Sequence, residues 1–513
     1  MTEAFGANGS ENLGVLERAE AENGSAAPLE TWEAALAAAT TDRGWLAHRV
    51  ASRARETGEL RRAARHAETA LTEPLNPLAR SDAHELVADA AAKDGDSARA
   101  ERHYVLAHLE DNLRTSAWHS LRALLERAGS TEFREMFFPF LGVPEAVLRR
   151  ACPDLPCLPR KPPPWPVLRF PNARTLSFSP PRGVAPFNYS LVERLRTTTP
   201  VDDLLVWELE DARLFYRYGS MHVVHEGALV APVSTGDLPV AALERPTTRL
   251  CGTVGVIADL FYAPNYAHWL LDAVPRVHVL RSAPGPAPEW YLANWSGAPY
   301  QTDHLAALGI RPDQLLSATE LGCIHADRLR ISMASMSVHH PAQGAANWAV
   351  NFVRQTMLPD PPPGPPARRL FVSRKDGTTR RIVNEDALFQ TLAERFGFER
   401  VVLADHDAPA QARLFRDAAV VVAAHGAGNA NFVFCARGAK IFEIFSPLHG
   451  TSAFFQIAGA VGAEYWAVEG DETLVVPVEV LTRSHANPHG SRDVAIDAER
   501  LSRILGEAGV SRR

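Results

Sequence analysis

The hydrophobic pattern changes character along the chain, and each change predicts a different kind of structure. Residues 29–129 are rich in Ala, Leu, Glu and Arg without strand-like alternation, which predicts consecutive helices. Short apolar and aromatic runs, broken at Gly219 and Gly227, follow at residues 204–232 and predict a meander of short strands. In the rest of the chain, apolar runs alternate with amphipathic segments. This order predicts parallel sheets covered by helices on both faces.

The helical part contains a repeat. The segment GELRRAARHAETAL begins at Gly58, and GDSARAERHYVLAHL begins 37 residues later at Gly95. Small side chains stand at matching places, where they would let paired helices approach closely: Ala63 and Ala70 in the first copy, Ala100 and Ala107 in the second. The pattern resembles a tetratricopeptide helix pair, although its period exceeds the usual value of about 34 residues. An ordinary helical bundle is the alternative.

Two proline-rich stretches divide the chain. One is PDLPCLPRKPPPWP at residues 153–166, and the other is LPDPPPGPPARR at residues 358–369. Such stretches favour extended, semi-rigid connections. We therefore expect a flexible leader at 1–28, a helical domain at 29–150, a proline-rich linker and connection at 151–203, an N-terminal α/β lobe at 204–357, a proline-rich hinge at 358–369 and a C-terminal α/β lobe at 370–513.

The composition restricts the class of protein. At 513 residues the chain is too long for one ordinary core. Its net charge of −7 argues against nucleic acid as the main partner. Five cysteines do not make a disulfide framework, and neither a signal peptide nor an apolar run of about 18 residues is present. We expect a cytoplasmic protein without a transmembrane segment, either free or associated with the inner face of the membrane.

Four cations follow the predicted strand RLFVSR. They are Arg374, Lys375, Arg380 and Arg381, and the next helix begins near Asn384. Guanidinium groups bind phosphate oxygens two donors at a time, so cations at the carboxyl end of a strand fit a diphosphate. A solvated turn with outward charges is the alternative.

A glycine-rich loop, HGAGNAN, ends the predicted strand VVVAA. Gly426 and Gly428 lack a Cβ, so backbone N–H groups can face a ligand, and Asn429 and Asn431 can cap the following helix. His425 can donate to a phosphate or a sugar hydroxyl. A tight strand-to-helix turn is the alternative.

The predicted strand KIFEIF contains one carboxylate, Glu443. A buried carboxylate needs hydrogen-bond partners, and a ribose diol would supply them. The alternative is an edge position or an ion pair with a nearby arginine.

The helix NYAHWLLDAVPR carries polar groups in an apolar setting. His268, Asp272 and Arg276 are spaced by four residues, so they share one helix face. Either His268, with its tautomer fixed by Asp272, or Asp272 itself would serve as the base for an acceptor hydroxyl. A helix-packing bond is the alternative. The further ligands that a metal would need are not evident.

These motifs together, over roughly residues 204–469, resemble the family 61 glycosyltransferases, a group that includes proteins of capsular polysaccharide biosynthesis. The resemblance implies a two-lobed, Rossmann-like glycosyltransferase-B fold and inverting transfer from a nucleotide-diphosphate sugar to a glycan, without a cofactor or an obligatory metal. It implies that the acceptor side is formed by Asn265, His268, Trp269, Asp272 and Arg276. It implies that the donor is bound by Ser373, Arg374, Arg381, Asn384, Glu385, His425, Gly426, Ala427, Gly428, Asn431 and Glu443.

The chain departs from the family pattern at two places. Ala430 stands where many members carry a threonine, and Ala267 replaces the usual bulky aromatic before the His-Trp pair. The second change is expected to widen the acceptor side. The alternative function is an inactive, transferase-like adaptor that uses its helical repeat to bind a protein partner. A hydrolase ranks last because no Gly-x-Ser-x-Gly elbow occurs.

Overall fold

The protein is described by a computed structural model of the full chain. The structure describes residues 28–513 apart from 40–41, 112–114, 133–142, 172–174, 184–197, 201–202, 218–219, 236, 259–264, 333–346, 447–452 and 473–492. The predicted leader therefore lies outside the described residues, except for its last residue. The chain divides into two compact units. One consists of Met1–Leu158, Arg217–Ser220 and Thr235–Leu243, and the other of Pro159–Tyr216, Met221–Ser234 and Glu244–Arg513.

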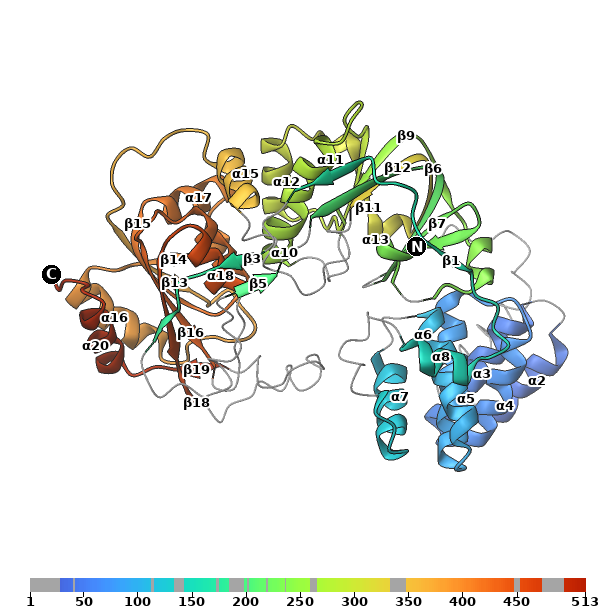
Figure 1. Ribbon diagram of the computed structural model, residues 1–513. Helices are drawn as coiled ribbons and strands as arrows, with labels where there is room; N and C mark the ends of the chain where they lie inside the picture. Colours follow the sequence, from blue (N-terminus) through green and yellow to red (C-terminus); the bar gives the residue numbers. More distant parts are fainter. Residues whose placement is uncertain are drawn as a thin grey trace. The chain divides into compact units, whose positions relative to one another are not determined.

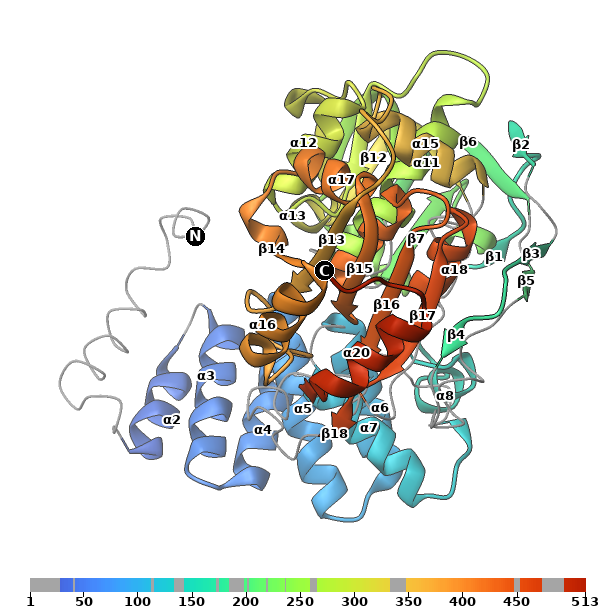
Figure 2. The same ribbon diagram turned by 90° about the vertical axis from the view of Figure 1, so that its left-hand side faces the viewer.

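The first unit is built from helices, as the sequence predicts. They are α2 (Leu29–Ala38), α3 (Arg43–Glu56), α4 (Leu60–Leu71), α5 (Pro77–Lys93), α6 (Ser97–Glu110), α7 (Thr115–Arg127) and α8 (Glu145–Ala151). Helices α3 and α4 pack as one antiparallel pair and α5 and α6 as the next, with α4 against α5. Figure 2 shows α2, α3 and α4 side by side. Gly58 and Gly95 adopt left-handed φ angles of 81° and 82° at the turns, which glycine does without strain.

The alanines of the repeat let the helices approach closely. Ala63, Ala70, Ala100 and Ala107 are all fully buried between helices, as expected from their spacing. The helical region is thus present in the structure, with a hydrophobic core in each half of the stack.

Enlarging one of these alanines is expected to destabilise the helical unit. Ala100→Leu should lower the free energy of unfolding by about 1–3 kcal/mol, because the added methyl groups meet a filled helix interface. Urea unfolding followed by circular dichroism measures the change. Ala98→Leu is the matched control, since Ala98 lies on the same helix and is exposed. Equal stability of the two variants would contradict close packing at Ala100.

The second unit contains two large sheets. The first has the order β1-β8-β7-β6-β12-β9-β10-β11, and β2 pairs with β6. Its strands are β1 (Arg160–Lys161), β2 (Leu168–Phe170), β6 (Leu204–Arg217), β7 (Ser220–His225), β8 (Ala228–Val230), β9 (Thr248–Val256), β10 (Trp290–Ala293), β11 (Leu315–Ser317) and β12 (Cys323–Ser332). Strands β12, β9, β10 and β11 are parallel, whereas β6 runs antiparallel to β12. The sheet is therefore mixed, because the predicted meander joins the parallel strands in one sheet.

The second sheet is parallel throughout, as the continuous apolar runs predict. Its order is β14-β13-β15-β16-β17-β4. The strands are β13 (Arg368–Ser373), β14 (Glu399–Val402), β15 (Ala418–Ala424), β16 (Lys440–Phe445), β17 (Glu464–Glu469) and β4 (Arg182–Gly183). Strand β4 comes from the predicted proline-rich connection, so part of that connection completes the C-terminal sheet.

Helices cover both faces of the parallel sheet. Helices α16 (Glu385–Phe396) and α20 (Ala498–Glu507) pack on one face with Phe371 and Val422. Helices α17 (Ala408–Arg416) and α18 (Ala453–Ala460) pack on the other face with Val421. Figure 1 shows these two pairs of helices on opposite sides of the strands. The carboxyl ends of β13, β15 and β16 consequently meet at one edge, where ligands bind in open α/β sheets.

Candidate functional site

The centre of the candidate site is a buried pair, His425 and Glu443. The imidazole Nδ1 of His425 lies 2.6 Å from Oε1 of Glu443, and His425 stacks on Phe445. Glu443 also accepts hydrogen bonds from the Asn429 amide, at 3.0 Å, and from the Tyr465 hydroxyl. Burial lowers the pKa of His425, and the charges of nearby arginines add to this effect. A neutral imidazole that donates its Nδ1 proton to Glu443 satisfies this arrangement and fixes the tautomer.

This geometry changes the role expected for Glu443. The sequence predicts that Glu443 faces a sugar diol, but its side chain is fully buried and already has three protein partners. Glu443 therefore orients His425. Tyr465 was missed because it belongs to the next strand, β17, and nothing in the local sequence links the two residues.

Removing the Glu443 carboxylate is expected to be costly. Glu443→Ala would leave His425, Asn429 and Tyr465 without their shared acceptor, which should lower the free energy of unfolding by about 3–5 kcal/mol. Urea unfolding measures the loss. Glu464→Ala is the control, because Glu464 is half-exposed and pairs with Arg182 at 3.3 Å; a change below about 1 kcal/mol is expected there. A stable Glu443→Ala variant would contradict the buried network.

The glycine-rich loop differs from the expected helix start. Residues Ala427–Phe434 form a 3₁₀ helix, η10, and no side chain caps its first residues. Asn429 and Asn431 are buried and bond elsewhere, so the predicted capping is wrong. Gly426 has an extended φ of 176°, which any residue adopts. Its lack of a Cβ matters for another reason: a Cβ there would overlap the Arg374 guanidinium.

Two partly buried arginines lie at this loop. Arg374 follows β13 and donates from Nε and Nη2 to the carbonyl of Thr379, at 3.3 and 3.1 Å. The buried Nε of Arg380 has no hydrogen-bond partner among the described residues. Burial lowers the pKa of Arg374, and burial together with the charge of Arg374 lowers the pKa of Arg380 to about 10. Within the described part of the chain, neither guanidinium forms an ion pair with a carboxylate.

Arg380 also has an unusual backbone. Its φ is 58°, in the left-handed region that costs a non-glycine residue about 1–2 kcal/mol. Strain of this kind persists where the surrounding structure holds a side chain in a particular direction, and it is frequent at functional sites. The sequence places Arg380 among four cations, and the family resemblance selects its neighbour Arg381 as the donor ligand.

The neighbouring Arg381 is engaged by the protein itself. Its Nε and Nη2 donate to Oδ2 of Asp493, at 3.0 and 2.8 Å, and its backbone N–H donates to Oδ1 of the same residue. The Asp493 side chain is 3% exposed, so the pair holds the turn in place. Asp493 was missed because it lies 112 residues from Arg381 in sequence.

The other residues predicted at the donor side support the same turn. The Ser373 hydroxyl donates to Oε1 of Glu385 at 2.7 Å, and the Arg374 backbone N–H donates to Oε2 at 3.3 Å. Asn384 exchanges two hydrogen bonds with the backbone of Ile496. These groups are satisfied within the protein and position Arg374.

A second polar pair lies on the helix that begins at Tyr266. Nδ1 of His268 is 2.7 Å from Oδ2 of Asp272, so the spacing of four residues does bring them together. The side chain of His268 is 32% exposed and that of Asp272 is 13% exposed. Asn265 accepts hydrogen bonds from two backbone N–H groups and caps the helix start, α10 (Tyr266–His268).

The rest of this helix does not keep its polar side chains on one face, although the spacing of four residues predicts this. A π-helical turn, η6 (Trp269–Ala273), separates α10 from α11 (Val274–Arg281) and changes the register of the side chains. Trp269 is buried. Arg276 is also buried, and its Nη1 donates to the carbonyls of Ile257 and Ala258, at 3.0 and 2.9 Å. Arg276 therefore holds the backbone that follows β9, and it does not extend the His268–Asp272 pair as a third accessible polar side chain.

A hydrogen bond joins the helix of the His268–Asp272 pair to the glycine-rich loop. The Tyr266 hydroxyl, on α10, donates to Oδ1 of Asn431 in η10, at 2.7 Å. Asn431 in turn donates to Gln411 and to the carbonyl of Gly428. The helix of the His268–Asp272 pair is thus tied directly to the glycine-rich loop. The sequence predicted Asn431 as a site residue but gave no sign of Tyr266.

Comparison with known proteins identifies part of this region. Residues 266–442 match the model of a family described as Glycosyltransferase 61. The matched part runs from α10 into β16. It includes the His268–Asp272 pair, the arginines after β13 and the glycine-rich loop, and it ends at Phe442, one residue before Glu443. A search of curated proteins gave no match. None of the described helices has the length and apolar character needed to span a bilayer. Among the described residues, no three His, Cys, Asp or Glu side chains are grouped as a metal site requires.

Proposed function

We propose that this chain is an inverting glycosyltransferase, because residues 266–442 match the family model described as Glycosyltransferase 61. It moves a sugar from a nucleotide-diphosphate sugar to a hydroxyl of a glycan. The parallel C-terminal sheet is the donor lobe and the mixed sheet is the acceptor lobe of a glycosyltransferase-B arrangement.

The observation that carries the proposal is the pair Arg374 and Arg380. Two partly buried cations side by side repel each other, and taking such charges out of water without a direct ion pair is costly. The described part of the chain supplies no carboxylate ion pair for either of them. The carboxylates of Asp376, Asp493 and Glu443 act on them without a direct ion pair, whereas a diphosphate would contact them directly, since guanidinium groups bind its oxygens in pairs. Gly426 lets the Arg374 guanidinium lie directly against the loop.

This arrangement supports the departure of a diphosphate. As the acceptor oxygen bonds to the anomeric carbon, the bond from that carbon to the phosphate oxygen breaks, and its electron pair leaves with the diphosphate. Arg374 and Arg380 stabilise the charge that develops there, since they are fixed before the reaction begins. They take the part that a divalent ion plays in other transferases, so we propose that no metal is obligatory. His425, which Glu443 orients, lies beside the leaving diphosphate.

The acceptor proton is taken by the His268–Asp272 pair. The 2.7 Å hydrogen bond between them fixes the orientation of one side chain while the other receives the proton. The Tyr266–Asn431 hydrogen bond keeps this helix in register with the donor loop. Attack from the acceptor lobe on the face opposite the leaving group inverts the anomeric carbon.

A panel of nucleotide-diphosphate sugars tests the proposal. We expect one of them to raise the melting temperature of the full chain and to be slowly hydrolysed, with EDTA present throughout. The stabilisation follows from ligand binding to the folded state alone. A stabilising donor that is hydrolysed only after a divalent cation is added would contradict metal independence. The absence of any shift with all donors and free nucleotides would favour the inactive adaptor.

A further inference from the structure

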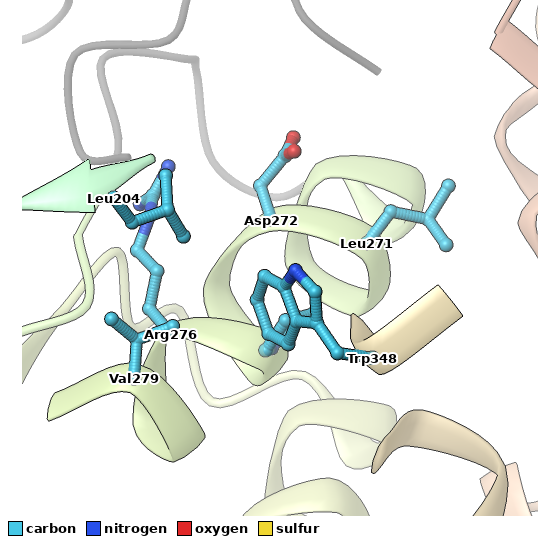
Figure 3. A pocket seen from close by; sticks show the side chains of 7 residues that line it. Leu204, Leu271, Asp272, Arg276, Val279 and Trp348 are labelled. Carbon is cyan, nitrogen blue, oxygen red and sulfur yellow. The ribbon is translucent and has the colours of Figure 1, made fainter. Parts of the chain in front are cut away.

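A small cleft opens beside the His268–Asp272 pair. Asp272, Arg276 and Trp348 line it together with apolar Leu204, Leu271 and Val279. Its volume is about 10 Å³, which is close to the space needed for one water-sized group. Figure 3 shows the Asp272 carboxylate at the edge of this cleft and Trp348 beside it. His268 does not line the cleft.

Trp348 carries a hydrogen-bond donor beside this cleft. It lies near the start of α15 (Asn347–Met357), and its ring is held by Phe170, at 4.9 Å between centroids, and by His278, at 6.1 Å. The buried indole N–H has no hydrogen-bond partner among the described residues. Figure 3 shows the indole nitrogen on the side of the ring that faces Asp272. A buried N–H of this kind is destabilising unless a ligand or water accepts from it.

The two groups are complementary to one kind of ligand group. Asp272 accepts hydrogen bonds and the Trp348 indole donates one. A hydroxyl does both, because its O–H donates to the carboxylate while its lone pair accepts from the indole. A ligand carboxylate would repel Asp272, and an ammonium group has nothing to offer the indole N–H.

We infer that Trp348 and Asp272 together hold the acceptor hydroxyl of a saccharide, so that Trp348 is a specificity-determining residue of the acceptor site. This inference rests on the proposed transferase function. The room for one water-sized group admits a single hydroxyl, and the sugar ring that carries it stays outside the cleft. The acceptor proton then lies against Asp272, and His268 is a positioning residue that acts through Asp272.

The test is acceptor kinetics with a panel of methyl glycosides, at saturating donor. Trp348→Phe removes the indole N–H and keeps an aromatic ring against Phe170. We expect its KM for the acceptor to rise about 3- to 10-fold, the effect of one neutral hydrogen bond, with kcat within about 2-fold. Trp348→His, which returns a ring N–H, should recover part of the loss. Trp165→Phe is the matched control, because Trp165 is 93% exposed, and its KM should equal that of the wild type.

Each other outcome overturns a separate claim. An unchanged KM in Trp348→Phe, with the variant melting like the wild type, would remove Trp348 from the acceptor site. Donor hydrolysis by the wild type without transfer to any methyl glycoside would overturn the saccharide assignment and leave the transferase proposal in place. The absence of both hydrolysis and a nucleotide-induced thermal shift would instead overturn the proposed function.

Discussion

Asp272→Asn is expected to lower kcat by about 10²- to 10⁴-fold, which is the usual contribution of a general base. The carboxylate lines the cleft beside Trp348 and is held at 2.7 Å by Nδ1 of His268. Asparagine has nearly the same shape, so packing is retained, but its amide cannot take a proton. Transfer of a labelled sugar from the donor identified by thermal shift measures the loss. The nucleotide-induced shift should persist, because the donor site that we propose lies at the carboxyl ends of β13 and β15.

The comparison with His268→Gln decides between the two candidate bases. His268 is 32% exposed and does not line the cleft, so its replacement should cost less, about 10-fold in kcat, through loss of the bond that positions Asp272. If His268→Gln is instead the inactive variant and Asp272→Asn retains activity, the proton goes to His268. If both variants transfer sugar at the wild-type rate, the pair belongs only to helix packing.

The secondary structure around the parallel C-terminal sheet follows from hydrophobic periodicity. Strands such as Ala418–Ala424 are buried on both faces, and they therefore read as continuous apolar runs flanked by amphipathic helices. The mixed character of the first sheet could not be read in the same way. The edge at which β6 joins β12 depends on pairing between segments more than 100 residues apart, and local periodicity does not record it.

Which polar residues belong to the site was only partly predictable. A cation cluster after β13 was visible, and the family resemblance selected Arg381 in it as the donor ligand; nothing in the local sequence pointed to Arg380. Their roles depend on a left-handed backbone at Arg380 and on a buried partner, Asp493, far along the chain. The same reason applies to Tyr266 and Tyr465, because tertiary hydrogen bonds across elements leave no local signal. The spacing of His268 and Asp272, in contrast, is a local helical property and was predictable.

Arg380→Gln is expected to abolish the donor response without destabilising the free protein. The Arg380 Nε has no described partner, and its charge lies beside that of Arg374, so loss of the charge removes repulsion from the ligand-free state. The free energy of unfolding should stay unchanged or rise by about 1–2 kcal/mol, after allowance for solvent screening of a partly buried group. In the same variant kcat/KM should fall by about 10²- to 10³-fold, because a charge that stabilises the leaving diphosphate is lost. Thermal unfolding with and without donor, together with initial rates, gives both quantities.

Arg381→Gln is the matched control. It removes the charge of the adjacent residue, but its expected effects on stability and on donor binding are the opposite of those of Arg380→Gln. It leaves the buried Asp493 without its ion pair, so it should destabilise the free protein by about 2–4 kcal/mol. The donor-induced shift in melting temperature should remain, because Arg381 is directed to Asp493 and not to the loop. Opposite effects from neighbouring arginines cannot arise from a general loss of positive charge at the turn. If Arg380→Gln binds the donor like the wild type and Arg381→Gln does not, the diphosphate is bound by Arg381, and the ion pair with Asp493 must open when the donor enters.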